Sequence, residues 1–231
     1  MAYENRLLTA LPPGERLRLA TRCEHVTIPK GTVLYEAGDP VQYAYFPTHG
    51  LLSRLAITPN GDAIEVAMVG SEGFIGLSIV LHSEATSYRI VAQLATAAVR
   101  VRAEILRAEL GRSSALHHAL LRYAHDVLSE TARSLVCHRF HSSSQRLSRW
   151  LLGAGDRVGS DTLDLTHECL AHVLGIPRTA VTEAAVVLQD AGHIWYRHGH
   201  IIIKNRLKLR MAACACYRAT DRGDARVRVA S

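Results

Sequence analysis

The sequence predicts an α+β fold: an N-terminal antiparallel β-roll, then a long central helix, then a C-terminal helical domain that carries a β-hairpin. Three observations predict it. Between residues 26 and 101, short runs of β-branched and aromatic residues alternate with glycine turns. Residues 112–141 contain no glycine and repeat apolar side chains at helical spacing. Beyond Thr166, two short amphipathic segments precede a second β-rich run.

Size and composition narrow the class of protein. A chain of 231 residues, 48% hydrophobic and 21% charged, suits two small folded domains. No apolar run approaches the roughly 18–20 residues that span a bilayer, and the first ten residues lack a signal peptide, so we expect a cytoplasmic protein without a membrane partner. The chain shows no nucleophile–base pair, phosphate loop or dinucleotide loop, so we expect no enzyme.

The positive charge is concentrated in the C-terminal part. The net charge is +6; residues 1–141 carry 14 Lys and Arg against 13 Asp and Glu, whereas residues 142–231 carry 13 against 8. A basic domain beside a neutral one indicates a polyanionic partner. The alternative is a merely solubilising surface.

The first predicted domain covers residues 1–112. Short helices are expected within residues 5–22, with Pro13 opening the second. The strands are expected at residues 25–28, 32–35, 43–46, 51–58, 63–69 and 90–101. Asn60-Gly61 predicts a two-residue hairpin turn in which both residues have positive φ.

The second predicted segment is a helix over residues 113–141, capped by Ser113 or Ser114. Its apolar seam comprises Leu116, Leu120, Tyr123 and Val127. Such a stripe packs on its own domain or on a second copy of the helix. A helix of this size is about 40 Å long, which is awkward to bury on one small roll, so we favour a homodimer.

The third predicted domain covers residues 142–231. Residues 141–144 (His-Ser-Ser-Ser) are the expected hinge, and a helix from Gln145 to Leu152 should end at Gly153 or Gly155.

Residues 165–204 then show the pattern of a winged helix-turn-helix. Thr166 is a good N-cap, Gly175 can take the left-handed conformation that makes the tight turn, and Pro177 can open the second helix. Gly192 ends that helix, and residues 193–204 form a hairpin of the right size for a wing. The first helix should bury Leu170, Val173 and Leu174, and the second Val181, Ala184, Ala185 and Leu188.

The second helix of such a unit enters the major groove of duplex DNA. Arg178 could contact guanine in bidentate fashion or hold a phosphate, and Glu183 could accept from cytosine or orient Arg178. Thr166 and Arg197 are expected on phosphates. The predicted DNA-binding residues are Thr166, Pro177, Arg178, Thr179, Thr182, Glu183 and Arg197.

These motifs resemble the Crp/Fnr superfamily of transcription regulators. The C-terminal signature includes Leu165-Thr166, Leu174-Gly175, Arg178, Val181-Thr182, residues 188–192 (Leu-Gln-Asp-Ala-Gly), Tyr196-Arg197, Gly199, Ala213-Cys214 and Cys216-Tyr217. Pro29-Lys30-Gly31, Leu34-Tyr35, Gly38-Asp39, Gly50 and residues 73–76 (Gly-Phe-Ile-Gly) resemble the family's cyclic-nucleotide-binding-like jelly roll. The resemblance implies a homodimer on double-stranded DNA, with RNA polymerase and a small-molecule effector as further partners to consider.

The chain departs from the family where cyclic nucleotides bind. Binding members have Gly-Glu for the ribose and Arg-Ser or Arg-Thr for the cyclic phosphate; here Gly76 precedes Leu77, and Thr86-Ser87 replaces the second pair, with Arg89 two residues later. We therefore expect no cyclic nucleotide and no cofactor. The candidate effector pocket is Gly73, Phe74, Ile75, Gly76, Leu77, Thr86, Ser87 and Arg89. Glu183 stands where well-known members have a DNA-reading arginine, so their operator cannot be transferred.

The histidines and cysteines are expected to be structural. The five cysteines are scattered, which disfavours disulfides and iron–sulfur clusters. His167, Cys169 and His172 share a helical face poorly, so no metal is expected. Cys214 and Cys216 could form a redox pair, but on a helix the two thiols would point in different directions, so we expect buried small residues there. Two alternatives remain: a small-molecule sensor whose output is not DNA binding, and a metal or redox sensor.

Overall fold

The computed structural model describes residues 5–217. The chain divides into two compact units. The N-terminal unit comprises residues 1–57 and 68–127, and the C-terminal unit comprises residues 58–67 and 128–231. The division differs from the three predicted segments, because the long helix contributes to both units and a short early segment belongs to the C-terminal one.

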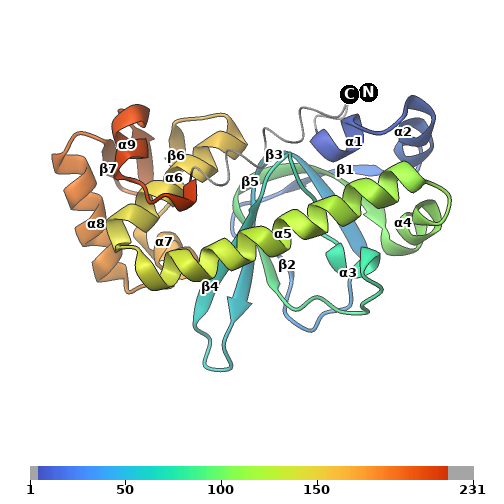
Figure 1. Ribbon diagram of the computed structural model, residues 1–231, viewed down its shortest axis with the longest axis horizontal. Coiled ribbons are helices and arrows are strands. Elements are labelled where there is room, and N and C mark those ends of the chain that lie inside the picture. Colours follow the sequence, from blue (N-terminus) through green and yellow to red (C-terminus); the bar gives the residue numbers. More distant parts are fainter. Residues whose placement is uncertain (1–4, 218–231) are drawn as a thin grey trace. The chain divides into compact units, whose positions relative to one another are not determined.

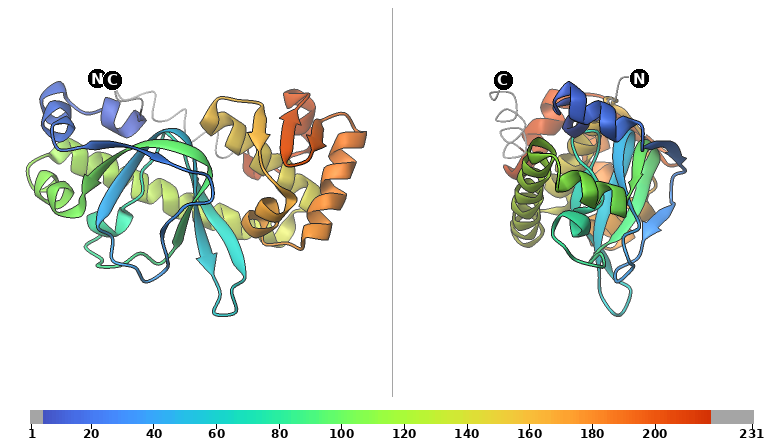
Figure 2. Two further views of the ribbon diagram at one scale, coloured as in Figure 1. Left: turned by 180° about the vertical axis from the view of Figure 1, so that it is seen from behind. Right: turned by 90° about the vertical axis from the view of Figure 1, so that its right-hand side faces the viewer.

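The N-terminal unit is the expected antiparallel roll (Figures 1 and 2). The elements of this part of the chain are α1 (Arg6–Thr9), α2 (Pro13–Ala20), β1 (Glu24–Ile28), β2 (Val33–Tyr35), β3 (Tyr43–Ile57), β4 (Ala63–Val69), α3 (Leu77–Val80), β5 (Arg89–Arg102) and α4 (Ala103–Leu110). The strands pair in the order β1-β5-β3-β4, with β2 also on β5, and residues 63–67 of β4 are among those assigned to the C-terminal unit. Pro13 opens α2 as predicted.

Strand β3 corrects the sequence prediction, because the two strands expected at 43–46 and 51–58 are one continuous strand. Its pairing with β5 shifts register around Pro47, His49 and Leu51, so bulges absorb the proline and the glycine that suggested a break. At Gly50, φ is +92°, and an added Cβ would lie 2.3 Å from the Ala95 carbonyl oxygen, so only glycine fits there.

The β3–β4 turn is also longer than predicted. Thr58 N donates to Asp62 O (2.8 Å) and Gly61 N donates to Thr58 O (2.9 Å), which leaves three residues in the loop. Gly61 has a φ of +91°, whereas Asn60 is not in the left-handed region. Three-residue hairpin loops need only one such residue, commonly glycine.

Helix α5 (Ser114–Phe140) has the expected length of 27 residues. Ser113 caps it, since its Oγ accepts from Leu116 N (3.0 Å).

The predicted seam of α5 is corrected. Leu116, Leu120, Tyr123 and Val127 all lie buried in the hydrophobic core of the N-terminal unit, so they face their own domain and are not available to a partner helix. The exposed apolar side chains of α5 include Leu121, Leu128 and Leu135, at 40%, 70% and 67% exposure. Their spacing of seven residues places them on one face of the helix.

Buried Arg54 links the roll to this helix. Its guanidinium donates to the Phe74 carbonyl oxygen (2.6 Å) and to the Tyr123 hydroxyl (3.3 Å). The Phe74 ring lies 5.3 Å from the rings of both Phe46 and Tyr123. Residue 74, in the predicted effector segment, is therefore packed directly on α5.

The C-terminal unit contains the predicted helical pair and wing, with one additional strand. Its elements are α6 (Ser143–Val158), β6 (Thr162–Asp164), α7 (His167–Leu174), α8 (Arg178–Asp190), β7 (Ile194–Arg197), β8 (His200–Ile203) and α9 (Arg206–Ala212). Strand β6, which the sequence did not reveal, pairs with β8 to give the order β6-β8-β7.

Helix α6 begins earlier and ends later than predicted. A capping box joins Ser142 and Gln145, so the expected hinge at 141–144 shortens to its first two residues. The helix runs past Gly153 and Gly155 and ends at Gly159, which is left-handed. An added Cβ at Gly155 would lie 3.0 Å from Ser160 O, so close packing explains this internal glycine.

No helix within residues 5–217 has the length and apolarity to cross a membrane.

The hairpin segment 58–67 is held within the C-terminal unit by buried polar contacts. Trp150 Nε1 donates to Glu65 Oε1 (2.8 Å), and Ser134 Oγ donates to Val66 O (3.2 Å). Both Glu65 and Trp150 are buried.

Replacing Glu65 with alanine should lower the free energy of unfolding by about 1–3 kcal/mol, because the Trp150 N–H would stay buried without an acceptor. Urea unfolding followed by tryptophan fluorescence measures the change. Glu65→Gln keeps an acceptor oxygen and should cost less. Equal losses in both variants would mean that the Trp150 hydrogen bond is not what Glu65 contributes.

Candidate nucleic-acid interface

Helices α7 and α8 form the predicted helix-turn-helix. Thr166 Oγ1 accepts from Cys169 N (3.2 Å), which caps α7. Gly175 ends α7 in the left-handed conformation, with a φ of +58°. Pro177 is the N-cap of α8 rather than its first residue, and the helix starts at Arg178. The seven apolar residues predicted to be buried in these two helices are all buried.

Strands β7 and β8 form the wing beside this pair (Figure 1). They are joined by His198 and Gly199, which both have positive φ (+48° and +84°), the requirement of a two-residue hairpin turn. A Cβ added to Gly199 would lie 3.4 Å from Thr166 Cγ2. The tip of the wing therefore lies next to the N-terminus of α7.

The structure places all seven predicted DNA-binding residues on the surface of the C-terminal unit. Arg178, Thr179, Thr182 and Glu183, from the first two turns of α8, line one shallow open groove. Thr166 lies at the start of α7, and Arg197 ends the first wing strand. Arg178 and Glu183 are both exposed.

His167 completes the support of α8, a role that the sequence prediction missed. Its side chain is buried and stacks on Tyr196 with ring centroids 4.0 Å apart. Thr182 Oγ1 donates its single proton to Arg178 O (3.0 Å), so His167 Nδ1 (2.9 Å from that oxygen) must be the donor to it. The histidine that directly follows an N-cap thus ties α7 to the first turn of α8 and to the wing.

The pKa of His167 is lowered, first because burial disfavours the imidazolium and second because of the positive charge of Arg178. In the unfolded chain the His167 imidazole takes up a proton once the pH falls below its ordinary pKa of about 6.5. In the folded protein the same imidazole takes up the proton only at a lower pH. The contribution of neutral His167 to the free energy of unfolding should therefore be fully present above about pH 6.5 and should be lost progressively as the pH drops below that value.

The test compares thermal unfolding of the wild type and of His167→Asn, whose amide nitrogen can still donate to Thr182, between about pH 7.5 and pH 5. The variant should lose part of the acid destabilisation. His172→Asn, at an exposed position of the same helix, is the control and should keep it. An identical pH profile for wild type and His167→Asn would refute the assignment.

Much of the basic charge in the C-terminal unit has structural partners. Arg206 pairs with Asp156 and with Asp161 (2.6 Å), and Arg157 pairs with Glu130 (3.4 Å). Buried Arg146 donates to the Leu174 carbonyl oxygen at the end of α7. Four arginines of the charge excess lie in residues 218–231, outside the described residues. Arg178 and Arg197 are the two cations among the predicted DNA-binding residues, and both are exposed.

The candidate effector segment does not offer a cyclic-phosphate site. Gly76 precedes α3 with a φ of +129°, and an added Cβ would lie 3.0 Å from Ala44 Cβ. Thr86 Oγ1 accepts from Tyr88 N (3.2 Å), and Arg89 Nε pairs with Glu36 Oε2 (2.7 Å) at the surface. The remaining predicted residues are buried (Gly73, Phe74 and Ile75), half-buried (Leu77) or exposed (Ser87). Within the described residues both cations at this segment are engaged, Arg89 with Glu36 and buried Arg54 with the Phe74 carbonyl and the Tyr123 hydroxyl, so the residues present do not fit a cyclic nucleotide.

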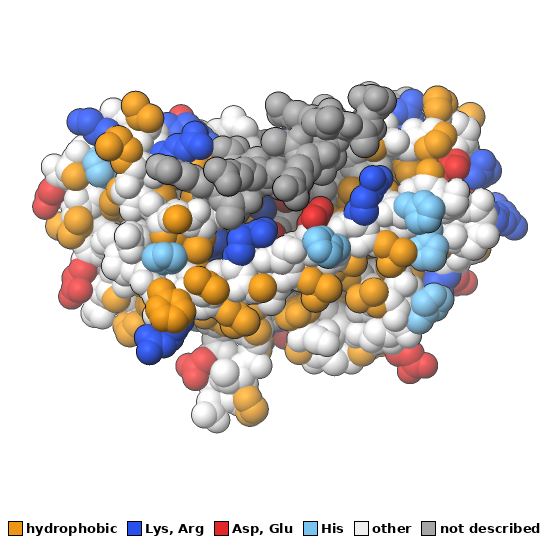
Figure 3. Space-filling view, in the orientation of Figure 1, with side chains coloured by type: hydrophobic (Ala, Val, Ile, Leu, Met, Phe, Trp, Pro, Cys, Tyr) orange, Lys and Arg blue, Asp and Glu red, His pale blue; other side chains and the backbone are white. Residues whose placement is uncertain are grey.

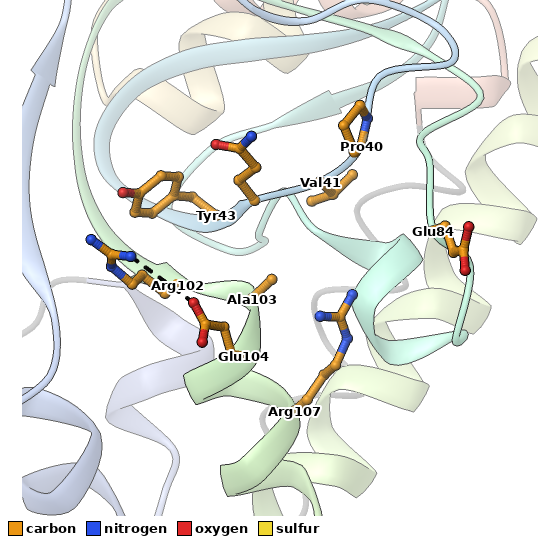
Figure 4. Close-up of a pocket in the computed structure, with 9 residues that line it drawn as sticks. Pro40, Val41, Tyr43, Glu84, Arg102, Ala103, Glu104 and Arg107 are labelled. Atoms are coloured by element: carbon orange, nitrogen blue, oxygen red, sulfur yellow. Dashed lines mark ion pairs between the residues drawn. The ribbon is translucent and has the colours of Figure 1, made fainter.

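An open pocket of about 410 Å³ lies elsewhere in the N-terminal unit (Figure 4). Its charged residues are of both signs: Arg102 lies 4.0 Å from Glu104, and Arg107 and Glu84 also line it. None of the predicted effector residues lines this pocket.

Comparison with known families assigns both parts of the chain. Residues 25–113 match the cyclic nucleotide-binding domain, and residues 145–212 match the Crp-like helix-turn-helix domain. No curated protein sequence matches the chain.

Similar solved structures show the same fold along most of the chain. FixK2 from Bradyrhizobium japonicum has a TM-score of 0.72 at 17% identity, over 84% of this chain and 98% of that one. A Crp/Fnr-family regulator from Eubacterium rectale has a TM-score of 0.71 at 19% identity, over 91% and 99%. The c-di-GMP responsive global regulator CLP from Xanthomonas campestris has a TM-score of 0.68 at 18% identity, over 83% and 99%.

The roll, the helix-turn-helix with its wing and the two family matches agree, and together they confirm the resemblance seen in the sequence. The chain belongs to the Crp/Fnr superfamily of DNA-binding transcription regulators.

Proposed function

We propose that the protein binds duplex DNA as a homodimer, with α8 of each copy in the major groove of one half-site. The observation that carries this proposal is the groove lined by Arg178, Thr179, Thr182 and Glu183 at the N-terminal end of α8. Recognition helices contact base edges with this end. Thr166, at the start of α7, and Arg197, at the end of β7, position the unit on phosphates, while Pro177 is the N-cap of α8.

Thr182 has a more limited role than a free hydroxyl would have. Its oxygen already bonds with His167 and with the Arg178 carbonyl. It therefore contacts DNA through its methyl group, for example against thymine, while Arg178 and Thr179 supply polar contacts.

The dimer contact proposed here is the exposed stripe of α5. Leu121, Leu128 and Leu135 recur every seven residues, the period at which two helices keep a common seam. Figure 3 shows hydrophobic side chains in a row along this helix, flanked by histidines. Val136 and Phe140, at 50% and 72% exposure, extend the apolar surface toward its end.

The β-roll acts in this proposal without a cyclic nucleotide. Thr86 replaces the phosphate-binding arginine, and Arg89 is held by Glu36. A charged phosphate brought into this segment would lose the charge-assisted hydrogen bond on which its binding depends.

Selection of DNA from a random pool by the full-length protein tests the proposal. The expected result is a two-fold symmetric site whose half-sites are about 34 Å apart, one turn of DNA. Adding cyclic AMP or cyclic GMP should leave the selected site, the affinity and the melting temperature unchanged. Recovery of no enriched sequence by folded protein at low salt would favour an output other than DNA binding.

A further inference from the structure

Four potential metal ligands converge in the C-terminal unit, and none of them is a predicted DNA-binding residue. They are Cys137, His141, Cys214 and Cys216, and their ligand atoms all lie within 4.8 Å of one another. Cys137 Sγ is 3.5 Å from Cys214 Sγ, and Cys216 Sγ is 3.8 Å from His141 Nδ1. Two segments more than 70 residues apart in sequence therefore supply one cluster of three sulfurs and one imidazole.

Local structure explains how each pair of ligands shares a face. Cys137 lies in the last turn of α5, and His141 follows four residues later, still bonded through its N–H to the Cys137 carbonyl (3.2 Å). Residues four apart on a helix face the same way. Helix α9 ends at Ala212, and Ala213 is extended, with a ψ of 152°.

This placement overturns the expectation for the Cys-x-Cys pair. On a continuous helix the two thiols would diverge, but Cys214 lies beyond the end of α9. Tyr217 N donates to Cys214 O (3.1 Å), so a tight turn brings Cys216 back toward Cys214. The sequence prediction assumed one continuous helix through Cys214 and Cys216. Because Ala213 is extended, the helix is interrupted before Cys214 and the two thiols need not diverge.

The spacing fits a single tetrahedral ion. Zinc binds thiolate sulfur at about 2.3 Å and imidazole nitrogen at about 2.0 Å, so its ligand atoms lie roughly 3.5–3.8 Å apart. The Cys137–Cys214 and Cys216–His141 separations of 3.5 Å and 3.8 Å lie in this range, and because all four ligand atoms lie within 4.8 Å of one another, the other pairs need only a small contraction. A Cys₃His set is a common structural zinc site.

The surroundings supply the matching charge. Three thiolates and one Zn²⁺ carry a net charge of −1, and Arg149 lies close enough to act electrostatically on the thiols. This electrostatic effect of Arg149 reaches Cys137, Cys214 and Cys216 alike. Arg149 Nε is buried and has no hydrogen-bond partner in the described part of the chain.

We infer that Cys137, His141, Cys214 and Cys216 form a zinc site that fastens the C-terminal end of the described chain to the end of α5. On binding, Zn²⁺ displaces the thiol protons to solvent, and the neutral imidazole binds through Nδ1. With four protein ligands the coordination is closed, so the site is structural rather than catalytic. The role is additional to DNA binding and does not depend on it.

Metal analysis of the purified full-length protein under reducing conditions tests this site. The expected result is one zinc per chain, removed by a strong chelator with a fall in melting temperature and restored by added zinc. Cobalt substituted for zinc should give sulfur-to-cobalt charge-transfer absorption and the intense visible bands of tetrahedral coordination. Neither signal requires DNA binding.

Matched variants separate a metal site from ordinary packing. Cys214→Ala and His141→Ala should weaken zinc binding by more than the roughly 100-fold that loss of an outer-shell partner costs. His141→Cys should retain the metal, because a fourth thiolate completes the tetrahedron. Cys23→Ala, at a cysteine in the N-terminal unit, and His125→Ala, at an exposed α5 histidine, should bind as the wild type does.

The proposal is overturned if reduced, folded protein reconstituted with excess zinc binds less than a stoichiometric amount. It is equally overturned if Cys137 and Cys214 form a disulfide whose reduction leaves no metal affinity. Retention of full zinc affinity by Cys214→Ala would also exclude the site.

Discussion

Replacing Leu128 with glutamate should convert the proposed dimer into monomers. Leu128 is 70% exposed in the single chain and lies midway along the exposed stripe of α5. Burying a leucine contributes about 1.5–3 kcal/mol. Because a two-fold interface uses each residue twice, the loss amounts to at least about 3 kcal/mol, or roughly 100-fold in the dimer dissociation constant. Opposed carboxylates add repulsion.

Analytical ultracentrifugation across a concentration series measures this effect. Leu17→Glu provides the matched control, since Leu17 is 68% exposed but lies on α2, away from the stripe. It should leave the dimer intact. The Leu128 variant should keep its circular dichroism spectrum and lose tight binding to a two-half-site DNA. A Leu128→Glu protein that remains a dimer at low micromolar concentration would place the interface elsewhere.

Replacing Arg178 with alanine should abolish most specific DNA affinity without unfolding the protein. Its side chain is exposed at the first position of α8, where a bidentate contact to guanine contributes about 1–3 kcal/mol. Two half-sites double this loss to about 2–6 kcal/mol, so affinity should fall by at least about 30-fold. Fluorescence anisotropy with the selected DNA gives the dissociation constants of the wild type and of Arg178→Ala.

The same variant distinguishes the two roles that the sequence leaves open for Arg178. If it reads a base, specificity should relax at one position per half-site, with little change in the salt slope. If it holds a phosphate, binding to all sequences should weaken and the slope of log K against log salt should fall by about one per contact. Arg107→Ala, in the N-terminal unit, removes an equal charge and should change neither the base specificity nor the salt slope. Unaltered DNA affinity in Arg178→Ala would refute the placement of α8 in the major groove of DNA.

Local signals in the sequence predicted the helix-turn-helix and its wing well, because short-range chemistry specifies them. Thr166 caps α7 through a residue three positions away, and Gly175 adopts the left-handed turn that its lack of a side chain permits. Short runs of β-branched and aromatic residues that alternate with glycine turns likewise predicted most strands of the roll. These features depend on contacts within a few residues.

The errors concern contacts between distant segments. Pro47 and Gly50 suggested a strand break, yet pairing with β5 accommodates both by bulges. Leu116 and Leu120 have the spacing of a dimer seam, but helical periodicity alone cannot show which of two apolar stripes meets the roll and which stays exposed. The Cys137–Cys214 proximity spans 77 residues and left no local pattern in the sequence.

The assignment of residues 58–67 to the C-terminal unit means that no single cut can release that unit intact. A fragment starting at residue 128 would leave the Trp150 indole and the Ser134 hydroxyl without Glu65 and Val66. During synthesis, the hairpin tip leaves the ribosome long before α6 exists, with the Glu65 carboxylate still in water. The DNA-binding half therefore depends, for its completion, on a strand that was translated as part of the roll.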